Sequence, residues 1–233
     1  MHYAPNGMWN YFLSVYFLQN KNNNNQLDEK KLKEFLTKII GFVWAYSFTN
    51  PGVNALRTPV YAEMINIVTG KEVKFDDFKF DENTLKTIIK NFDFKNGRPI
   101  TKSMLTWWAF TEKEQALPLL NTIFEIEHIF AKKRQENDKS LTNVKNLECL
   151  GNKSLLEDKV NIRASEYRFV DKVKYYQGFT NDKGHFKQGT FIVELKKLPI
   201  TNTDFTEKDI ETRNINIINK FIDFLKDNEL IKE

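Results

Sequence analysis

Apolar residues recur at spacings of three and four through the first half of the chain, which is typical of helices that bury one face. This spacing predicts helices over residues 9–18, 29–46, 59–67, 82–92 and 101–110. Asp28 and Asp81 stand where the N-caps of two of these helices are expected. Trp107 and Trp108 lie on an apolar stripe, so we expect them in a core rather than on a base-stacking surface.

The pattern changes near residue 121. Residues 124–128 alternate apolar and charged side chains, as a half-buried strand does. After them the sequence predicts a polar loop over 132–143, a second extended stretch over 147–156 and a helix over about 165–176. Thr206 and Asp209 resemble a capping box that opens a last amphipathic helix.

These elements predict an α+β protein in three parts. Residues 1–120 form a helical domain, residues 121–180 a compact strand–strand–helix core, and residues 181–233 an extension whose amphipathic helix packs on that core. The chain has 233 residues with 41% hydrophobic and 28% charged residues, enough apolar side chains to bury a core.

Composition excludes several kinds of protein. The single cysteine, Cys149, rules out an intrachain disulfide and a four-cysteine zinc site, and it fits a reducing, cytoplasmic location. The apolar run over 9–18 is too short to cross a bilayer, so we expect no membrane association. Phosphate-binding and serine-hydrolase motifs are missing, so ATPase, dinucleotide-binding and serine-hydrolase activities lose their usual support.

Of the three histidines, His128 is the candidate for chemistry. His2 is terminal, and we expect His185 in a surface turn. His128 closes the strand-like segment beside Glu127. A neutral imidazole suits a general base at neutral pH, and a carboxylate can hold a divalent cation. The alternative is a surface pair at the end of a strand.

An ordered set of residues favours the chemical interpretation. Glu127-His128-Ile129 is followed by Gly151-Asn152-Lys153-Ser154-Leu155-Leu156, then by Asn161, by Phe169 with Lys172, and by Tyr175-Tyr176. The set resembles the HNH nuclease family of the ββα-metal type, and more narrowly the C-terminal HNH domain of GmrSD-type, type IV restriction proteins. Ala131 stands where the family usually has proline, and Lys153 where it has an apolar residue.

The resemblance implies a role for each matched residue. His128 would be the general base and Asn152 the residue that braces the loop around it. Glu127 would bind a metal ion, with Asn161 as a second ligand through its side-chain oxygen. Three cations are expected to contact nucleic acid: Lys172 through the resemblance, Arg163 as a phosphate contact on physical grounds, and Lys153.

The implied protein is a metal-dependent endonuclease, with Mg²⁺ or Mn²⁺ as cofactor and double-stranded DNA as substrate, that serves restriction or phage defence. The resemblance leaves open an N-terminal nucleotide-dependent domain in a longer natural chain. Charge placement agrees with a phosphate-binding surface, because residues 128–176 carry 11 Lys and Arg against 7 Asp and Glu, a net of +4 that equals the net charge of the whole chain.

Alternatives remain open. One is a catalytically inactive nucleic-acid-binding or protein-interaction module that keeps the HNH fold, and another is a helical interaction domain in which Asn152 and Asn161 lie far from His128. Geometry adds a condition, since neighbouring residues on a regular strand point to opposite faces. Glu127 and His128 share a site only if the strand ends or bulges there, and otherwise Glu125 shares the face of Glu127.

Overall fold

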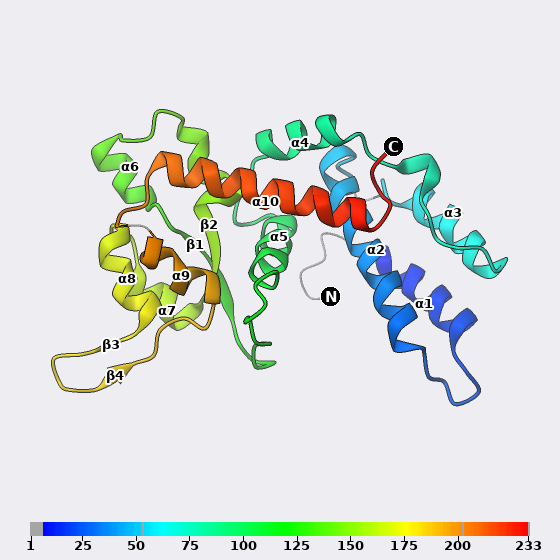
Figure 1. Ribbon diagram of the computed structural model, residues 1–233, viewed down its shortest axis with the longest axis horizontal. Coiled ribbons are helices and arrows are strands. Elements are labelled where there is room, and N and C mark those ends of the chain that lie inside the picture. Colours follow the sequence, from blue (N-terminus) through cyan, green and yellow to red (C-terminus); the bar gives the residue numbers. More distant parts are fainter. Residues whose placement is uncertain (1–6, 53, 202, 233) are drawn as a thin grey trace. The chain divides into compact units, whose positions relative to one another are not determined.

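The computed structural model describes residues 7–52, 54–201 and 203–232, and its element order is shown in Figure 1. The chain divides into two compact units, one formed by Met1–Phe92 with Ile218–Glu233 and the other by Asp93–Ile217. The structure is α+β, as the sequence predicts. Within the described ranges, no helix is both long enough and apolar enough to cross a bilayer.

The first unit is helical. Its elements are α1 (Trp9–Asn20), α2 (Glu29–Thr49), α3 (Arg57–Val68), η1 (Asp76–Phe78), α4 (Glu82–Asn91) and the last part of α10 (Glu207–Asp227). Its core is aromatic, with the rings of Phe42 and Phe75 stacked at 3.7 Å between centroids. The predicted caps are confirmed, because the Asp28 and Asp81 side chains accept hydrogen bonds from the backbone N–H groups three residues on.

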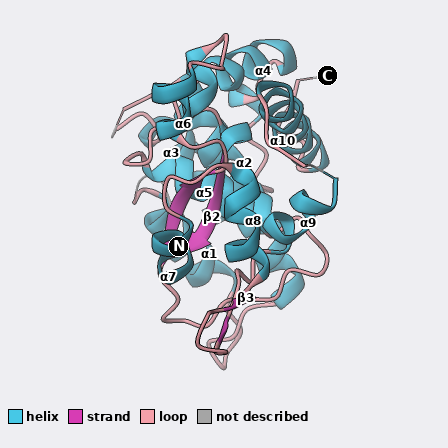
Figure 2. Cartoon of the chain, turned by 90° about the vertical axis from the view of Figure 1, so that its left-hand side faces the viewer, coloured by secondary structure: helices cyan, strands magenta, loops and turns pink. Residues whose placement is uncertain are grey.

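The second unit is built around a pair of strands, drawn in magenta in Figure 2. β1 (Phe124–His128) pairs with β2 (Lys153–Glu157) in antiparallel register, with Phe124 opposite Glu157 and His128 opposite Lys153. α5 packs against β2, and α7 packs against both strands. The remaining elements are α5 (Pro99–Ala109), α6 (Lys132–Asp138), η2 (Val144–Glu148), η3 (Leu150–Asn152), α7 (Asp158–Ala164), α8 (Phe169–Gln177), β3 (Phe179–Thr180), β4 (Phe186–Lys187), α9 (Val193–Thr201) and the start of α10.

Three expectations for this unit are wrong in detail. The predicted polar loop over 132–143 begins with α6, a short helix that ends where Lys139 turns into the left-handed region. The second strand begins only at Lys153, because residues 144–152 form two 3₁₀ turns. The predicted helix over 165–176 begins only at Phe169, as α8. A separate short helix, α7, precedes it and ends at Ser165, whose φ of 45° interrupts a right-handed helix.

Candidate active site around His128

His128 lies at the end of β1 and is largely enclosed. Its side chain is 12% exposed, and its Nε2 atom lies 3.6 Å from Oε1 of Glu148. Within the described part of the chain, this nitrogen is buried without a hydrogen-bond partner. Burial, followed by the charges of Lys153 and Lys132, lowers the pKa of His128 from 6.5 to about 3, against the opposing effect of Glu148. The imidazole is therefore neutral at physiological pH.

The carboxylate that faces His128 is Glu148, which the sequence analysis did not single out. Lys132 and Lys153 each place an ammonium group 2.5 Å from a Glu148 carboxylate oxygen. Burial alone would raise the pKa of Glu148, but these hydrogen bonds outweigh it and lower the pKa to about 2. No local motif marks Glu148, because its neighbours come from α6 and from the first residue of β2.

Glu127 points away from His128. β1 keeps a regular register with β2 through both residues, so their side chains leave opposite faces of the strand. Glu127 is 4% exposed, and its Oε1 accepts hydrogen bonds from the Tyr176 hydroxyl at 2.6 Å and from the Lys172 ammonium at 2.8 Å. Burial raises the pKa of Glu127, whereas Lys172 and Tyr176 lower it. β1 does end at His128, but its register stays regular through both residues, so Glu127 and His128 do not share a face.

Two of the three residues expected to contact nucleic acid are buried. Lys153 is 0% exposed, and its ammonium also donates to the carbonyl of Phe94 at 2.5 Å and to the side chain of Asn96 at 2.7 Å. Lys172 is 1% exposed and donates to the carbonyl of His128 at 2.7 Å as well as to Glu127. Neither ammonium group is exposed to a phosphate in this arrangement, and the nucleic-acid contacts of Lys153 and Lys172 stay predictions.

Arg163, the third expected contact, lies on α7 and is half-buried. Its guanidinium donates to the carbonyl of Gln188 at 2.6 Å, in the loop that follows β4. This hydrogen bond ties α7 to the loop, and the phosphate contact of Arg163 stays a prediction.

Asn152 is fully buried and holds the chain directly after His128. Its side-chain oxygen accepts the N–H of Phe130 at 2.7 Å, its amide nitrogen donates to the carbonyl of Phe130 at 3.1 Å, and its own carbonyl accepts the N–H of Ile129 at 2.9 Å. The same amide nitrogen reaches the carbonyl of Leu147 at 3.2 Å. The geometry is that of a loop brace, which fits the role the resemblance implies.

The Glu127 carboxylate is not free to bind a metal ion in this arrangement. It is already compensated by the Lys172 ammonium group, and the metal contact of Asn161, which lies on α7, stays a prediction. Glu148 also has two ammonium groups, which disfavours a cation there. A search of the described residues finds no group of three His, Cys, Asp or Glu side chains placed to hold a metal ion. The residues therefore do not fit a metal at Glu127.

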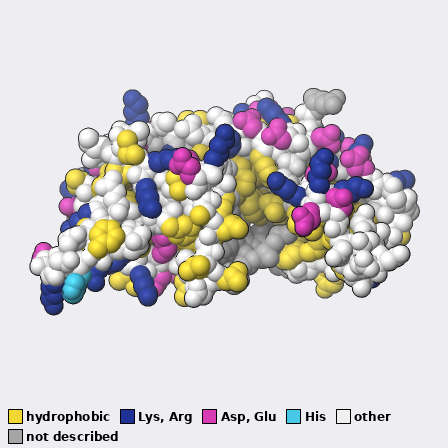
Figure 3. All heavy atoms as spheres, turned by 60° about the horizontal axis from the view of Figure 1, so that its bottom comes forward, with side chains coloured by type: hydrophobic (Ala, Val, Ile, Leu, Met, Phe, Trp, Pro, Cys, Tyr) yellow, Lys and Arg dark blue, Asp and Glu magenta, His cyan; other side chains and the backbone are white. Residues whose placement is uncertain are grey.

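The surface shows no concentrated basic patch on the face drawn in Figure 3. Lysine and arginine side chains are interspersed there with acidic ones. Of the two lysines that hold Glu148, Lys132 has an exposed side chain, at 46%. The positive excess counted over 128–176 is thus partly internal, since Lys153 and Lys172 belong to the interior.

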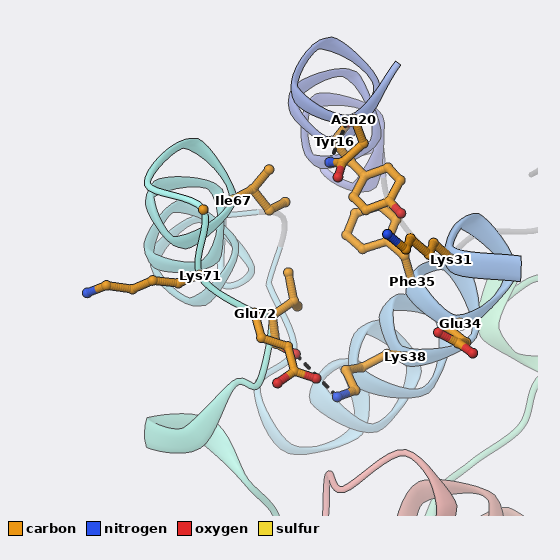
Figure 4. A pocket seen from close by; sticks show the side chains of 11 residues that line it. Tyr16, Asn20, Lys31, Glu34, Phe35, Lys38, Ile67, Lys71 and Glu72 are labelled. Atoms are coloured by element: carbon orange, nitrogen blue, oxygen red, sulfur yellow. Dashed lines mark hydrogen bonds between the residues drawn. The ribbon is translucent and has the colours of Figure 1, made fainter. Parts of the chain in front are cut away.

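A separate pocket of about 410 Å³ lies in the first unit, between α1, α2 and the loop after α3 (Figure 4). Tyr16 stacks on Phe35 at its wall, with 3.7 Å between ring centroids. Lys38, also at the wall, is already bonded to the carbonyl of Val73 and to Glu229. The other charged residues, Lys31, Glu34, Lys71 and Glu72, balance one another, so the pocket does not indicate a ligand class.

Together, the strands and helices of the second unit define an α+β domain that holds a neutral, enclosed histidine at a strand end, with its loop braced by an asparagine. A family model for the C-terminal domain of GmrSD restriction endonucleases matches residues 77–220. The match spans more than half of the chain, which therefore belongs to this family of nuclease domains of the restriction-endonuclease type. Comparisons with curated proteins and with solved structures find no match.

Proposed function

We propose that this chain hydrolyses phosphodiester bonds of double-stranded DNA as the HNH-type nuclease part of a restriction or phage-defence protein, with His128 as the general base. The observation that carries the proposal is the place of His128 at the end of β1, before a loop that Asn152 braces, with an Nε2 atom that has no hydrogen bond among the described residues. The family match over residues 77–220 supports the class of reaction.

The chain's own residues supply three parts of such a mechanism. His128 takes a proton from the attacking water, a contribution that is typically about 10²–10⁴-fold in rate. Asn152 fixes the loop that follows the base. Lys132, with its exposed side chain, supplies positive charge near the base where a phosphate would approach.

The Mg²⁺ or Mn²⁺ ion that the resemblance implies stays a prediction. Glu127, the expected ligand, is bonded to Lys172 and Tyr176, so we derive no step through a metal. Glu127 instead holds Lys172, whose ammonium also fixes the carbonyl of His128.

The experiment is plasmid nicking by the whole chain in the presence of Mg²⁺ or Mn²⁺. His128→Ala is expected to lower the rate at saturating DNA at least about 100-fold while leaving DNA affinity unchanged. His185→Ala is the matched control, because His185 is exposed and lies between β3 and β4. Undiminished cleavage by His128→Ala would contradict the assignment.

A second candidate is a catalytically inactive nucleic-acid-binding or protein-interaction module that keeps the HNH fold. The ion pair between Glu127 and Lys172 favours it, because that pair occupies the carboxylate that the resemblance assigns to a metal. The same assay separates the two candidates. An inactive module shows no nicking at any concentration of chain or of either cation, whereas the nuclease shows nicking that His128→Ala removes.

A further inference from the structure

A buried arginine in the second unit holds the segment that contains Asn152. Arg213 lies in the first part of α10, is 6% exposed and donates through Nη1 to three backbone carbonyls, those of Leu150 at 2.8 Å, Gly151 at 3.0 Å and Lys153 at 2.8 Å. These residues flank Asn152 on both sides. The guanidinium therefore fixes the backbone at the point where the 3₁₀ turn becomes β2.

Arg213 is itself oriented by a carboxylate. Glu194 of α9 is 7% exposed and accepts two parallel hydrogen bonds, from Nε of Arg213 at 2.6 Å and from Nη2 at 2.8 Å. The indole N–H of Trp108, from α5, donates to the same carboxylate at 2.6 Å. A two-point arginine–carboxylate pair sets direction as well as distance, because both planes must align.

The backbone at Gly151 is pressed against α10 at the same place. Its N–H donates to the side chain of Asn214 at 3.1 Å. A Cβ atom added to Gly151 would lie 2.0 Å from the carbonyl oxygen of Ile210, which is far inside contact distance. Only glycine allows this approach, so α10 fixes the segment through both Arg213 and the backbone.

We propose that Trp108, Glu194 and Arg213, here called the Arg213 clamp, are positioning residues that set the geometry of His128 through Asn152. The connection has two steps. The clamp holds the carbonyls on either side of Asn152, and Asn152 holds the N–H groups of Ile129 and Phe130 directly after His128. The consequence for catalysis rests on the proposed function, but the positioning itself does not.

The three residues that hold the segment around Asn152 lie far apart in the sequence. α5, α9 and α10 each contribute one of these side chains. Trp108 and Glu194 orient Arg213, and Arg213 holds the loop through its hydrogen bonds to backbone carbonyls. A clamp of this kind is expected to alter turnover rather than affinity for DNA.

Hydrogen exchange of the full chain tests the positioning directly. In Arg213→Lys, protection of the Ile129 and Phe130 amides is expected to fall at least about tenfold more than protection of the Ser165 amide, which donates to the carbonyl of Asn161 in α7. Trp108→Phe, which removes the indole N–H donor and leaves a smaller aromatic ring, is the milder variant and is expected to show the same difference at smaller size.

The matched control is Leu195→Ala. Leu195 is fully buried on α9, next to Glu194, and its apolar side chain does not hydrogen-bond to residues 150–153. The control is expected to lower protection of all three amides alike. Equal losses at Ile129, Phe130 and Ser165 in both clamp variants would overturn the proposal.

Plasmid nicking then separates this proposal from the proposed function. If the chain is a nuclease, Arg213→Lys is expected to lower kcat at least about tenfold with KM for DNA unchanged, whereas loss of DNA affinity without a change in kcat would contradict a positioning role. If the chain cleaves no DNA, the proposed function fails, and the amide exchange still decides whether the clamp positions the loop.

Discussion

The acid sensitivity of the second unit is expected to come largely from His128. The folded state holds the pKa of this imidazole at about 3 through burial and the neighbouring Lys153 and Lys132, against 6.5 ordinarily. Between these two values the unfolded chain binds a proton that the folded chain does not, so stability falls as pH falls. Glu148 has the same sign, because its pKa is also lowered, but it contributes only as pH approaches 4.5 and below.

The size of the effect follows from linkage. The pKa of His128 is 6.5 in the unfolded chain and about 3 in the folded chain. Between pH 7 and pH 5, this difference lowers the free energy of unfolding by about 2 kcal/mol. Glu148 adds only a few tenths of a kcal/mol over the same interval, since its unfolded carboxyl is still mostly ionised at pH 5. Glu127, whose pKa is raised, contributes with the opposite sign in the wild type and in a His128 variant alike, so the difference between the two proteins isolates His128.

The assay is urea unfolding at pH 7 and at pH 5, followed by tryptophan fluorescence, for the wild-type chain and His128→Gln. Between the two pH values, the free energy of unfolding of the wild type is expected to fall by about 2 kcal/mol more than that of the variant. His185→Gln, at the exposed histidine, is expected to follow the wild type. Equal losses in wild type and His128→Gln would refute the view that burial keeps His128 neutral.

Three further predictions concern the contacts around the base. Lys172→Met leaves Glu127 buried without its cation and is expected to cost about 3–5 kcal/mol, measured by urea unfolding, with Lys174→Met on the exposed face of α8 as a near-neutral control. Asn152→Ala removes both side-chain contacts to Phe130 and is expected to cost about 2–4 kcal/mol in the same assay. Gly151→Ala places a Cβ against the backbone of α10 and is expected to lower the melting temperature by several degrees, whereas an unchanged value would show that the close approach is not required.

The helical part of the fold is predictable from the sequence because its signals are local. Asp28 and Asp81 lie directly before apolar stripes, and their side chains cap α2 and α4. Alternation over five residues identified β1. The prediction of a loop over 132–143 is wrong at its start, where α6 lies. Polarity alone does not distinguish a loop from a short surface helix that has no buried residue to mark its period.

The surroundings of the site depend on contacts that a linear pattern does not show. Lys153 and Lys172 look like ordinary surface cations in the sequence, yet each is buried with a carboxylate partner. The sequence does not mark Glu148 as a site residue, because it becomes a neighbour of His128 only when β1 and β2 pair. Asn152 was placed near the base by the family resemblance, and the structure shows the hydrogen bonds by which it holds that loop.

The central claim is that the chain is a nuclease with His128 as its base. The most direct measurement is the rate of plasmid nicking at saturating DNA, with Mg²⁺ or Mn²⁺ present, for the wild-type chain beside His128→Ala and His185→Ala. The account predicts cleavage by the wild type and by His185→Ala, and a rate at least about 100-fold lower for His128→Ala. Equal rates for all three proteins, or no cleavage by the wild type under any of these conditions, would contradict it.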